Sequence, residues 1–122
     1  MEHDLLTSFL EGTTSPVQFA LAVKQEVEVC EEGVRSPENI GYIVITDGPQ
    51  VNVTREHMKR LLQAMLDESI PWMSANYTGD CLVMSDDFHP EDEEVAEAID
   101  FVADDSRRPT ATETRIALEA LR

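Results

Sequence analysis

The chain has 122 residues, with 25 Asp and Glu against 9 Lys and Arg, so its formal net charge is −16. This charge argues against direct nucleic-acid binding, because a nucleic-acid binder displaces counterions from phosphates with an excess of Lys and Arg. The hydrophobic fraction of 42% predicts a packed core, the length suits a single domain over residues 1–122, and no apolar run approaches the ~20 residues that span a bilayer. Because the first residues lack a basic segment followed by an apolar stretch, we expect a cytoplasmic protein with no signal peptide and no membrane span.

The N-terminal part is predicted to be helical. Leucine and phenylalanine side chains at 5–10 form one apolar stripe of a short helix, and Gly12 stands where a helix commonly ends. Ser15 and Pro16 are typical of a helix start, with the serine as cap and the proline at the first helical position. A second helix is therefore expected to follow and to end at Gly33.

The segment 41–53 breaks the helical pattern. β-Branched residues at 42–46 precede an Asp-Gly-Pro turn at 47–49, and Val51 and Val53 alternate with polar neighbours. Two interpretations remain open for this segment: a small two-stranded hairpin, or an extended crossover.

Two helices are predicted in the middle of the chain. Thr54 is the expected N-cap of the first, whose apolar residues recur at i, i+3, i+4, i+7 and i+8. Pro71 is expected to begin the second, which carries Trp72. Because Gly79 weakens this helix by up to ~1 kcal/mol relative to alanine, a strand at 81–85 competes with the helix there.

Two more helices are predicted in the last third. Pro90 is expected to open a helix over 90–104, and Thr110 and Glu113 form a capping box ahead of the final helix. The apolar residues expected to face inward from this final helix are Ile116, Ala117, Ala120 and Leu121.

Together these patterns predict a mainly α fold, a compact bundle of about five to six short helices with an extended segment or small β-hairpin around 41–53. The stretches 5–11 and 61–67 match at an offset of 56 residues, and each is followed by a loop and a helix that opens near a proline. The match indicates either two helix-loop-helix units or a chance similarity between short amphipathic helices.

The acidic residues are concentrated in one part of the chain. Residues 61–106 contain 13 acids and no Lys or Arg, whereas 107–122 contain four bases and two acids. At ~100° per residue, the apolar residues of the predicted 90–104 helix share one side, and a stripe of carboxylates occupies the other. Acids at i and i+4 repel one another, so this stripe is either a solvated face or a docking surface for a basic partner. The stripe consists of Glu93, Glu97, Asp100 and Asp104.

The sequence contains no recognisable catalytic motif. It has no phosphate-binding glycine loop, GxSxG elbow or HExxH, and its three histidines lie in separate segments. The acidic stretch 86–92 lacks the central glycine of an EF-hand loop. Cys30 and Cys81 show neither metal-ligand nor redox spacing, which favours two free cysteines. We therefore expect no enzymatic activity, no cofactor and no dedicated metal site.

Three stretches carry a family-like pattern: FLEG at 9–12 with SPVQF at 15–19, TREHMKRLL at 54–62, and MSDDF at 84–88 followed by an acidic helix. This pattern resembles that of small bacterial proteins of the toxin-immunity type, which neutralise a cognate toxin. The resemblance implies a helical protein whose acidic face blocks a basic toxin, often a nuclease. It places no residue in a catalytic role.

The expected function is that of a non-enzymatic acidic protein-binding domain that captures a basic partner through its 86–105 face. Electrostatic capture would be followed by burial of a few apolar anchors. The alternative is a self-associating accessory or structural domain, a homodimer that buries Trp72 and whose acidic face is only solvating. The candidate partner-binding residues are Asp87, Glu93, Glu97, Asp100, Asp104 and Trp72.

Overall fold

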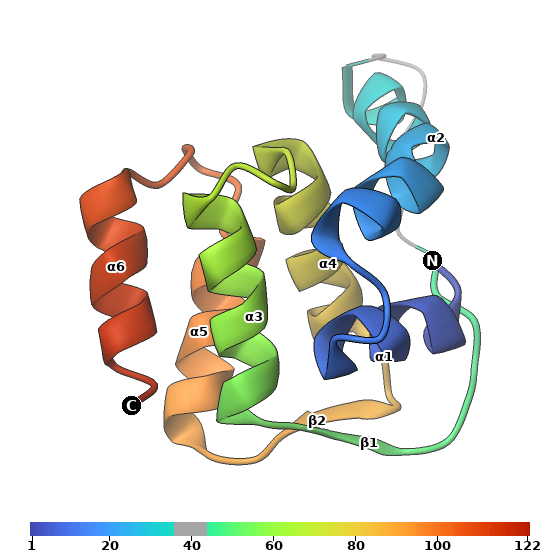
Figure 1. The fold of residues 1–122 in the computed structure, drawn as a ribbon. Coiled ribbons are helices and arrows are strands. Elements are labelled where there is room, and N and C mark those ends of the chain that lie inside the picture. Colours follow the sequence, from blue (N-terminus) through green and yellow to red (C-terminus); the bar gives the residue numbers. More distant parts are fainter. Residues whose placement is uncertain (36–43) are drawn as a thin grey trace.

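The computed structural model describes residues 1–35 and 44–122, which form six helices and a two-stranded sheet (Figure 1). The predicted mainly α fold is confirmed. The helices are α1 (His3–Glu11), α2 (Pro16–Arg35), α3 (Arg55–Leu66), α4 (Trp72–Met84), α5 (Glu93–Ala103) and α6 (Ala111–Glu119). The strands are β1 (Val51–Val53) and β2 (Phe88–Pro90).

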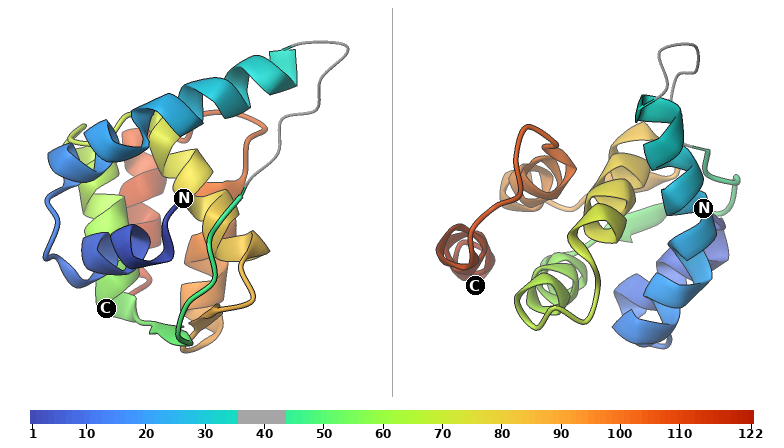
Figure 2. Two further views of the ribbon diagram at one scale, coloured as in Figure 1. Left: turned by 90° about the vertical axis from the view of Figure 1, so that its right-hand side faces the viewer. Right: turned by 90° about the horizontal axis from the view of Figure 1, so that it is seen from above.

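Helix α3 is the hub of the bundle, because it packs against α1, α5 and α6. Helices α4 and α5 share the most extensive contact between helices in the described ranges, and α2 lies across α4. Helix α6 lies at the outer edge of the bundle, packed mainly on α3 (Figures 1 and 2). Helices α5 and α6 are therefore held beside each other mainly through α3.

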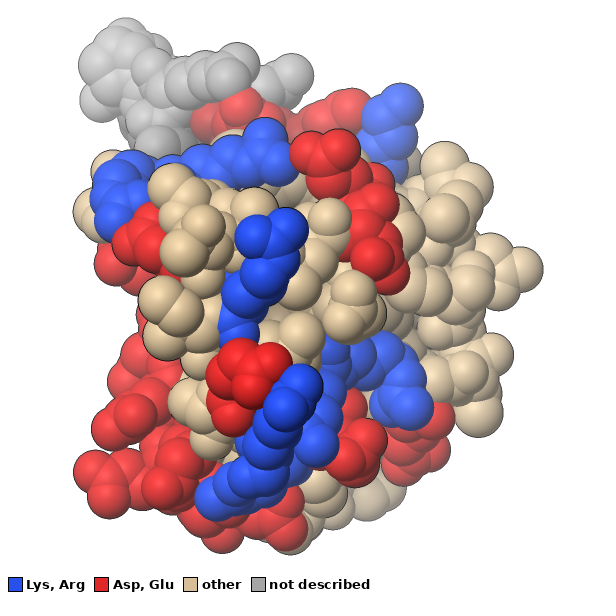
Figure 3. All heavy atoms as spheres, turned by 60° about the vertical axis from the view of Figure 1, so that its left-hand side comes forward, with Lys and Arg blue, Asp and Glu red and all other residues tan. Residues whose placement is uncertain are grey.

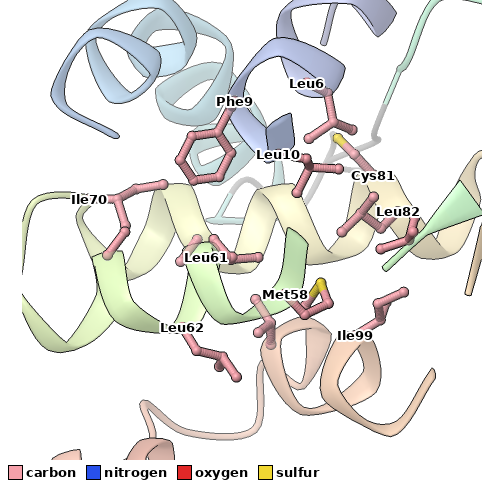
Figure 4. Close-up of a cluster of buried hydrophobic side chains, with 14 of the residues drawn as sticks. Leu6, Phe9, Leu10, Met58, Leu61, Leu62, Ile70, Cys81, Leu82 and Ile99 are labelled. Atoms are coloured by element: carbon pink, nitrogen blue, oxygen red, sulfur yellow. The ribbon is translucent and has the colours of Figure 1, made fainter. Parts of the chain in front are cut away.

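The hydrophobic core lies where α1, α3, α4 and α5 meet (Figure 4). The phenyl ring of Phe9 stacks on that of Phe19, with ring centroids 4.3 Å apart and planes 9° from parallel, which joins α2 to this core. Gly12 ends α1 at φ +83°, a left-handed conformation that favours glycine and turns the chain towards α2. The labelled core residues are Leu6, Phe9, Leu10, Met58, Leu61, Leu62, Ile70, Cys81, Leu82 and Ile99.

Helix α2 combines a buried and an exposed apolar side. Phe19 and Val23 are fully buried, whereas Val17 and Leu21 are 56% and 68% exposed. Its far end reaches beyond the rest of the bundle (Figure 2). At 20 residues α2 is the longest helix in the structure, yet neither it nor any other helix of the described ranges is long and apolar enough to cross a membrane.

Of the two interpretations of 41–53, the described residues do not form the hairpin, because β1 pairs with β2 in parallel. The register sets Val51 opposite Phe88 and Val53 opposite Pro90. Parallel strands need a long crossover, and here α3 and α4 supply it. Residues 44–50 run without a strand towards β1, so the extended alternative describes them, while the start of the proposed strand at 42–46 lies partly outside the described residues.

The strand alternative at 81–85 is also wrong, because α4 continues as a helix to Met84. The buried Gly79 has a packing role in this helix. A Cβ atom at that position would lie 2.8 Å from the backbone nitrogen of Ala103, so the missing side chain lets α4 and α5 approach closely. The nearby Asn76 side-chain amide donates a hydrogen bond of 3.0 Å to the Val102 carbonyl, which reinforces the same contact.

Two predictions for the last third need correction. Pro90 does not open a helix: it belongs to β2, a short edge strand where its missing N–H is tolerated, and Asp92 caps α5 instead. The capping box of Thr110 and Glu113 is confirmed at the start of α6. However, Ile116 is 65% exposed, so only part of the predicted apolar face of α6 turns inward.

Candidate functional site

The acidic face predicted for 90–104 is the outer side of α5. The Asp92 carboxylate caps this helix by accepting a hydrogen bond of 2.9 Å from the Val95 backbone N–H. On the inner side Val95, Ile99 and Val102 are buried against the bundle. This amphipathic packing forces the remaining, mostly acidic positions of α5 towards solvent.

Some of the acids at this helix have structural partners. The Arg55 Nε donates to the Asp92 carboxylate at 2.9 Å, and the Nη2 of the same guanidinium lies 3.4 Å from the Glu94 carboxylate. The pKa of Asp92 is lowered by the Val95 N–H and by Arg55. These carboxylates also lie at the positive end of the helix dipole, so their placement is explained by stability alone.

Two acids of α5, Glu97 and Asp100, have no such explanation, and a third, Glu93, is favoured only by the helix dipole of the first turn. Glu93, Glu97 and Asp100 are exposed, and within the described residues none of their carboxylates has a hydrogen-bond or ion-pair partner. Glu93 and Glu97 are four residues apart and Glu97 and Asp100 three, spacings at which like charges repel on a helix surface. Asp100 also lies near the C-terminal end of α5, where the helix dipole disfavours a negative charge. We call these three residues the free acidic face.

Two other predicted site residues have local structural roles. The Asp87 carboxylate accepts hydrogen bonds from the Gly48 N–H at 3.1 Å and the Gln50 amide at 2.8 Å, which ties the segment before β1 to β2. Asp104 accepts a hydrogen bond of 2.9 Å from the Ser106 N–H, which lowers the pKa of Asp104. These carboxylates therefore stabilise loops at the two ends of the α5 region.

Trp72 lies at a different place. Its side chain is half-buried, packs against the core and lines a hollow of about 300 Å³ that it shares with Ile70, Arg108 and Thr114. The residues that line this hollow include none of the free acidic face. The structure thus does not bring Trp72 together with the other predicted partner-binding residues.

An apolar groove of about 330 Å³ lies between α5 and α6. We call it the α5/α6 groove. Of the free acidic face, only Glu97 lines it. Sequence reasoning missed this groove because it placed Ile116 in the core. The residues that line the groove are Glu94, Glu97, Ala98, Phe101, Glu113, Ile116, Ala117 and Ala120.

The side of the molecule formed by α6 and α3 carries most of the positive charge. Figure 3 shows Lys and Arg side chains gathered across this side, with Asp and Glu crowded at the lower left of the view. Of the nine basic residues, three belong to α3 and four to 107–122. Most of these seven form ion pairs with nearby carboxylates. The Arg107 guanidinium, for example, donates to the Glu113 carboxylate at 2.5 and 2.7 Å, which lowers the pKa of Glu113 to about 2. Little positive charge is therefore left for the free acidic face.

Residues that often hold metals or carry out catalysis are dispersed in the structure. Within the described residues no group of three His, Cys, Asp or Glu is placed to hold a metal ion. Cys30 and Cys81 are both free, and burial raises the pKa of the Cys81 thiol to about 12. The His57 imidazole takes part in the cap of α3, and burial lowers its pKa.

Comparisons of the chain with protein-family models, with curated proteins and with solved structures found no match. The resemblance to toxin-immunity proteins therefore stays a prediction.

Proposed function

We propose that this protein is a non-enzymatic binding domain that captures a basic protein partner through the free acidic face of α5. The observation that carries the proposal is the lack of partners around Glu93, Glu97 and Asp100 in the described residues. Their mutual repulsion opposes folding, and the last turn of α5 contains no basic residue that would offset it. A basic partner would relieve this repulsion on binding.

The mechanism begins with long-range attraction. A surface of one sign steers an oppositely charged partner and raises the association rate, and salt screens this attraction over a Debye length of about 8 Å at physiological ionic strength. Complexes of this kind lose association rate steeply as salt rises. The proposed complex is therefore salt-sensitive, and its partner carries a Lys- and Arg-rich patch.

The test compares two variants that each lose three negative charges. The first neutralises the free acidic face with E93Q, E97Q and D100N. The second is a matched control, E2Q, E28Q and D47N, at exposed positions whose carboxylates have no partner in the described residues. Wild type and both variants are immobilised, incubated with lysate of the source cells at low salt and eluted with rising salt.

The expected result is a basic protein retained by the wild type and by the control and lost by the first variant. The same eluted proteins at the same salt from all three would overturn the proposal, because the free acidic face would then take no part in capture. Equal loss from the two variants would also overturn it, because only overall charge would then matter. Circular dichroism on each variant checks that α5 is folded.

An immunity-type inhibitor is the narrower form of this proposal. The resemblance of the 9–19, 54–62 and 84–88 stretches to such proteins supports it, and so does the acidic surface that a basic toxin would meet. Under this form the partner retained at low salt is a toxin, often a nuclease, and its activity falls in proportion to the protein bound.

A second candidate function is self-association, and the exposed side of α2 favours it. Val17, Leu21 and Met73 are 56%, 68% and 43% exposed and line a shallow groove of about 420 Å³ between α2 and the start of α4. Two copies joined here would bury these residues, and Trp72 would take no part. Light scattering at two concentrations tests this candidate: a dimer that Leu21→Glu converts to a monomer supports it, and a monomeric wild type excludes it.

A further inference from the structure

Apolar side chains of two helices remain partly exposed in the α5/α6 groove. Helix α5 packs on α4 and α6 packs on α3, yet both helices retain apolar residues that face the same groove. Ile116 is 65% exposed there, next to the other apolar side chains that line the groove. Three alanines, Ala98, Ala117 and Ala120, leave room between the walls, and Phe101 supplies further contact area.

The charge around the groove is one-sided. Three glutamates line it and no Lys or Arg does. Glu94 lies near Arg55 and Glu113 binds Arg107, so both are already partly neutralised. Glu97 has no partner in the described residues and belongs to the free acidic face, which therefore borders the groove. The wall formed by α5 therefore favours positive charge along one edge of an occupant.

The shape of the site favours a helix as the occupant. A peptide that adds as a strand needs an open sheet edge. The lining of this groove comes from α5, α6 and the C-cap residue of α6, Ala120, and β1 and β2 contribute nothing to it. An amphipathic helix can instead place apolar side chains at i, i+3, i+4 and i+7 into a groove between two helices.

We propose that the α5/α6 groove binds a cationic amphipathic helix of the partner protein. Its apolar face contacts Phe101 and Ile116, and its Lys or Arg residues lie along Glu97 and the neighbouring acids of α5. This inference rests on the proposed function and adds to it the structural class of the recognition element and the anchors that hold it. The anchors lie outside the free acidic face, so charge and apolar contact are separable by mutation.

The test uses two fluorescent peptides of about 18 residues built only from Leu and Lys. One has the leucines at helical spacing along one face, and the other has the same composition in scrambled order. Fluorescence anisotropy measures the affinity of each peptide for the full-length protein. We expect the amphipathic peptide to bind roughly tenfold more tightly than the scrambled one. In ¹⁵N-resolved NMR spectra, the shifted amides should lie on the facing sides of α5 and α6.

Matched variants locate the apolar contact. Ile116→Ser should weaken binding of the amphipathic peptide by roughly tenfold, as expected for an interface anchor, and should leave the scrambled peptide unaffected. Val29→Ser is the control, because Val29 is exposed to a similar degree, 62%, on a different helix and lines neither groove. Glu97→Gln should weaken binding of both peptides by a similar factor, so that the ratio of their affinities stays unchanged.

Equal binding of the two peptides, or no binding of either, overturns the groove proposal. If Glu93→Gln, Glu97→Gln and Asp100→Asn together still abolish capture of a basic protein, the proposed function stands without the groove. If light scattering shows a dimer that Ile116→Ser dissociates, the occupant is a second copy of this chain and the proposal is also overturned. If the triple variant of the free acidic face and its charge-matched control capture the same proteins from the lysate, while the peptide results are as expected, the proposed function is overturned instead.

Discussion

Arg55 and Asp92 form an ion pair that fastens one end of the α5/α6 groove. The Arg55 Nε–H donates to the Asp92 carboxylate at 2.9 Å, while another of its guanidinium nitrogens donates to the Arg122 carbonyl at 3.0 Å, just beyond α6. One side chain from α3 thereby joins the start of α5 to the end of α6. At the other end, the Arg107–Glu113 pair ties the loop after α5 to the first turn of α6.

Replacing Arg55 by alanine should loosen this end of the groove. Asp92 and Glu94 would lose their basic neighbour, so the thermal midpoint should fall and amides at the start of α5 and the end of α6 should exchange hydrogen faster. Arg55→Lys should restore the charge without the planar fork and recover the exchange rates only in part. Arg115→Ala is the control, because Arg115 is exposed and has no partner in the described residues. Equal hydrogen-exchange rates in the Arg55→Ala and Arg115→Ala variants would contradict this role of Arg55.

Gly79→Ala should destabilise the fold although alanine is the better helix former. The added Cβ would lie 2.8 Å from the Ala103 nitrogen, so α4 and α5 would have to move apart. Overpacking of this kind costs about 1–3 kcal/mol, against a helix-propensity gain of at most ~1 kcal/mol. Urea unfolding measures the difference. Val83→Ala on the exposed side of the same helix should change stability by less than about 0.5 kcal/mol. A Gly79→Ala protein more stable than wild type would show that the contact relaxes freely.

The sequence predicts the helices well, because their signals are local. The Thr54 cap and the apolar spacing after it lie within one helix, and α3 forms as expected. The pairing of Val51 with Phe88 joins residues far apart in the chain, and no local pattern encodes it. The local sequence does not decide between helix and strand at 81–85 for a related reason: the packing role of Gly79 depends on its contact with α5, which is far from it in the chain.

The candidate site was predictable in part. Helical periodicity correctly places Glu93, Glu97 and Asp100 on the exposed side of α5. It does not reveal that Asp87 is held by the segment before β1, since that contact depends on the tertiary fold. The groove was missed because α6 has apolar residues on two sides, and only packing decides that α3 covers one of them and leaves Ile116 exposed.

The stability of the fold should depend on pH through Asp80. Burial, and secondly the nearby Asp105, raise the pKa of this half-buried carboxyl from 3.8 to about 6. A raised pKa in the folded state means that the fold favours the neutral form, so the stabilisation is present below about pH 4 and is lost as the pH rises through 6. Asp80→Asn should remove this dependence and raise the urea midpoint at neutral pH. Asp47→Asn at an exposed site is the control, and identical pH profiles for wild type and Asp80→Asn would contradict the prediction.

Two single-charge substitutions on α5 should have opposite effects on stability. Asp100 lacks a partner in the described residues and lies near the C-terminal end of the helix, whereas Glu94 lies in the first turn, 3.4 Å from Arg55. Asp100→Asn should therefore raise the free energy of unfolding by about 0.5 kcal/mol, and Glu94→Gln should lower it by a similar amount. Both changes should shrink in high salt, because screening weakens surface electrostatics. Capture of a basic partner should follow the reverse order, with the stabilised Asp100→Asn the weaker binder. If both substitutions shift the free energy of unfolding in the same direction, the unpaired charge of Asp100 and the paired charge of Glu94 do not differ in their effect on stability.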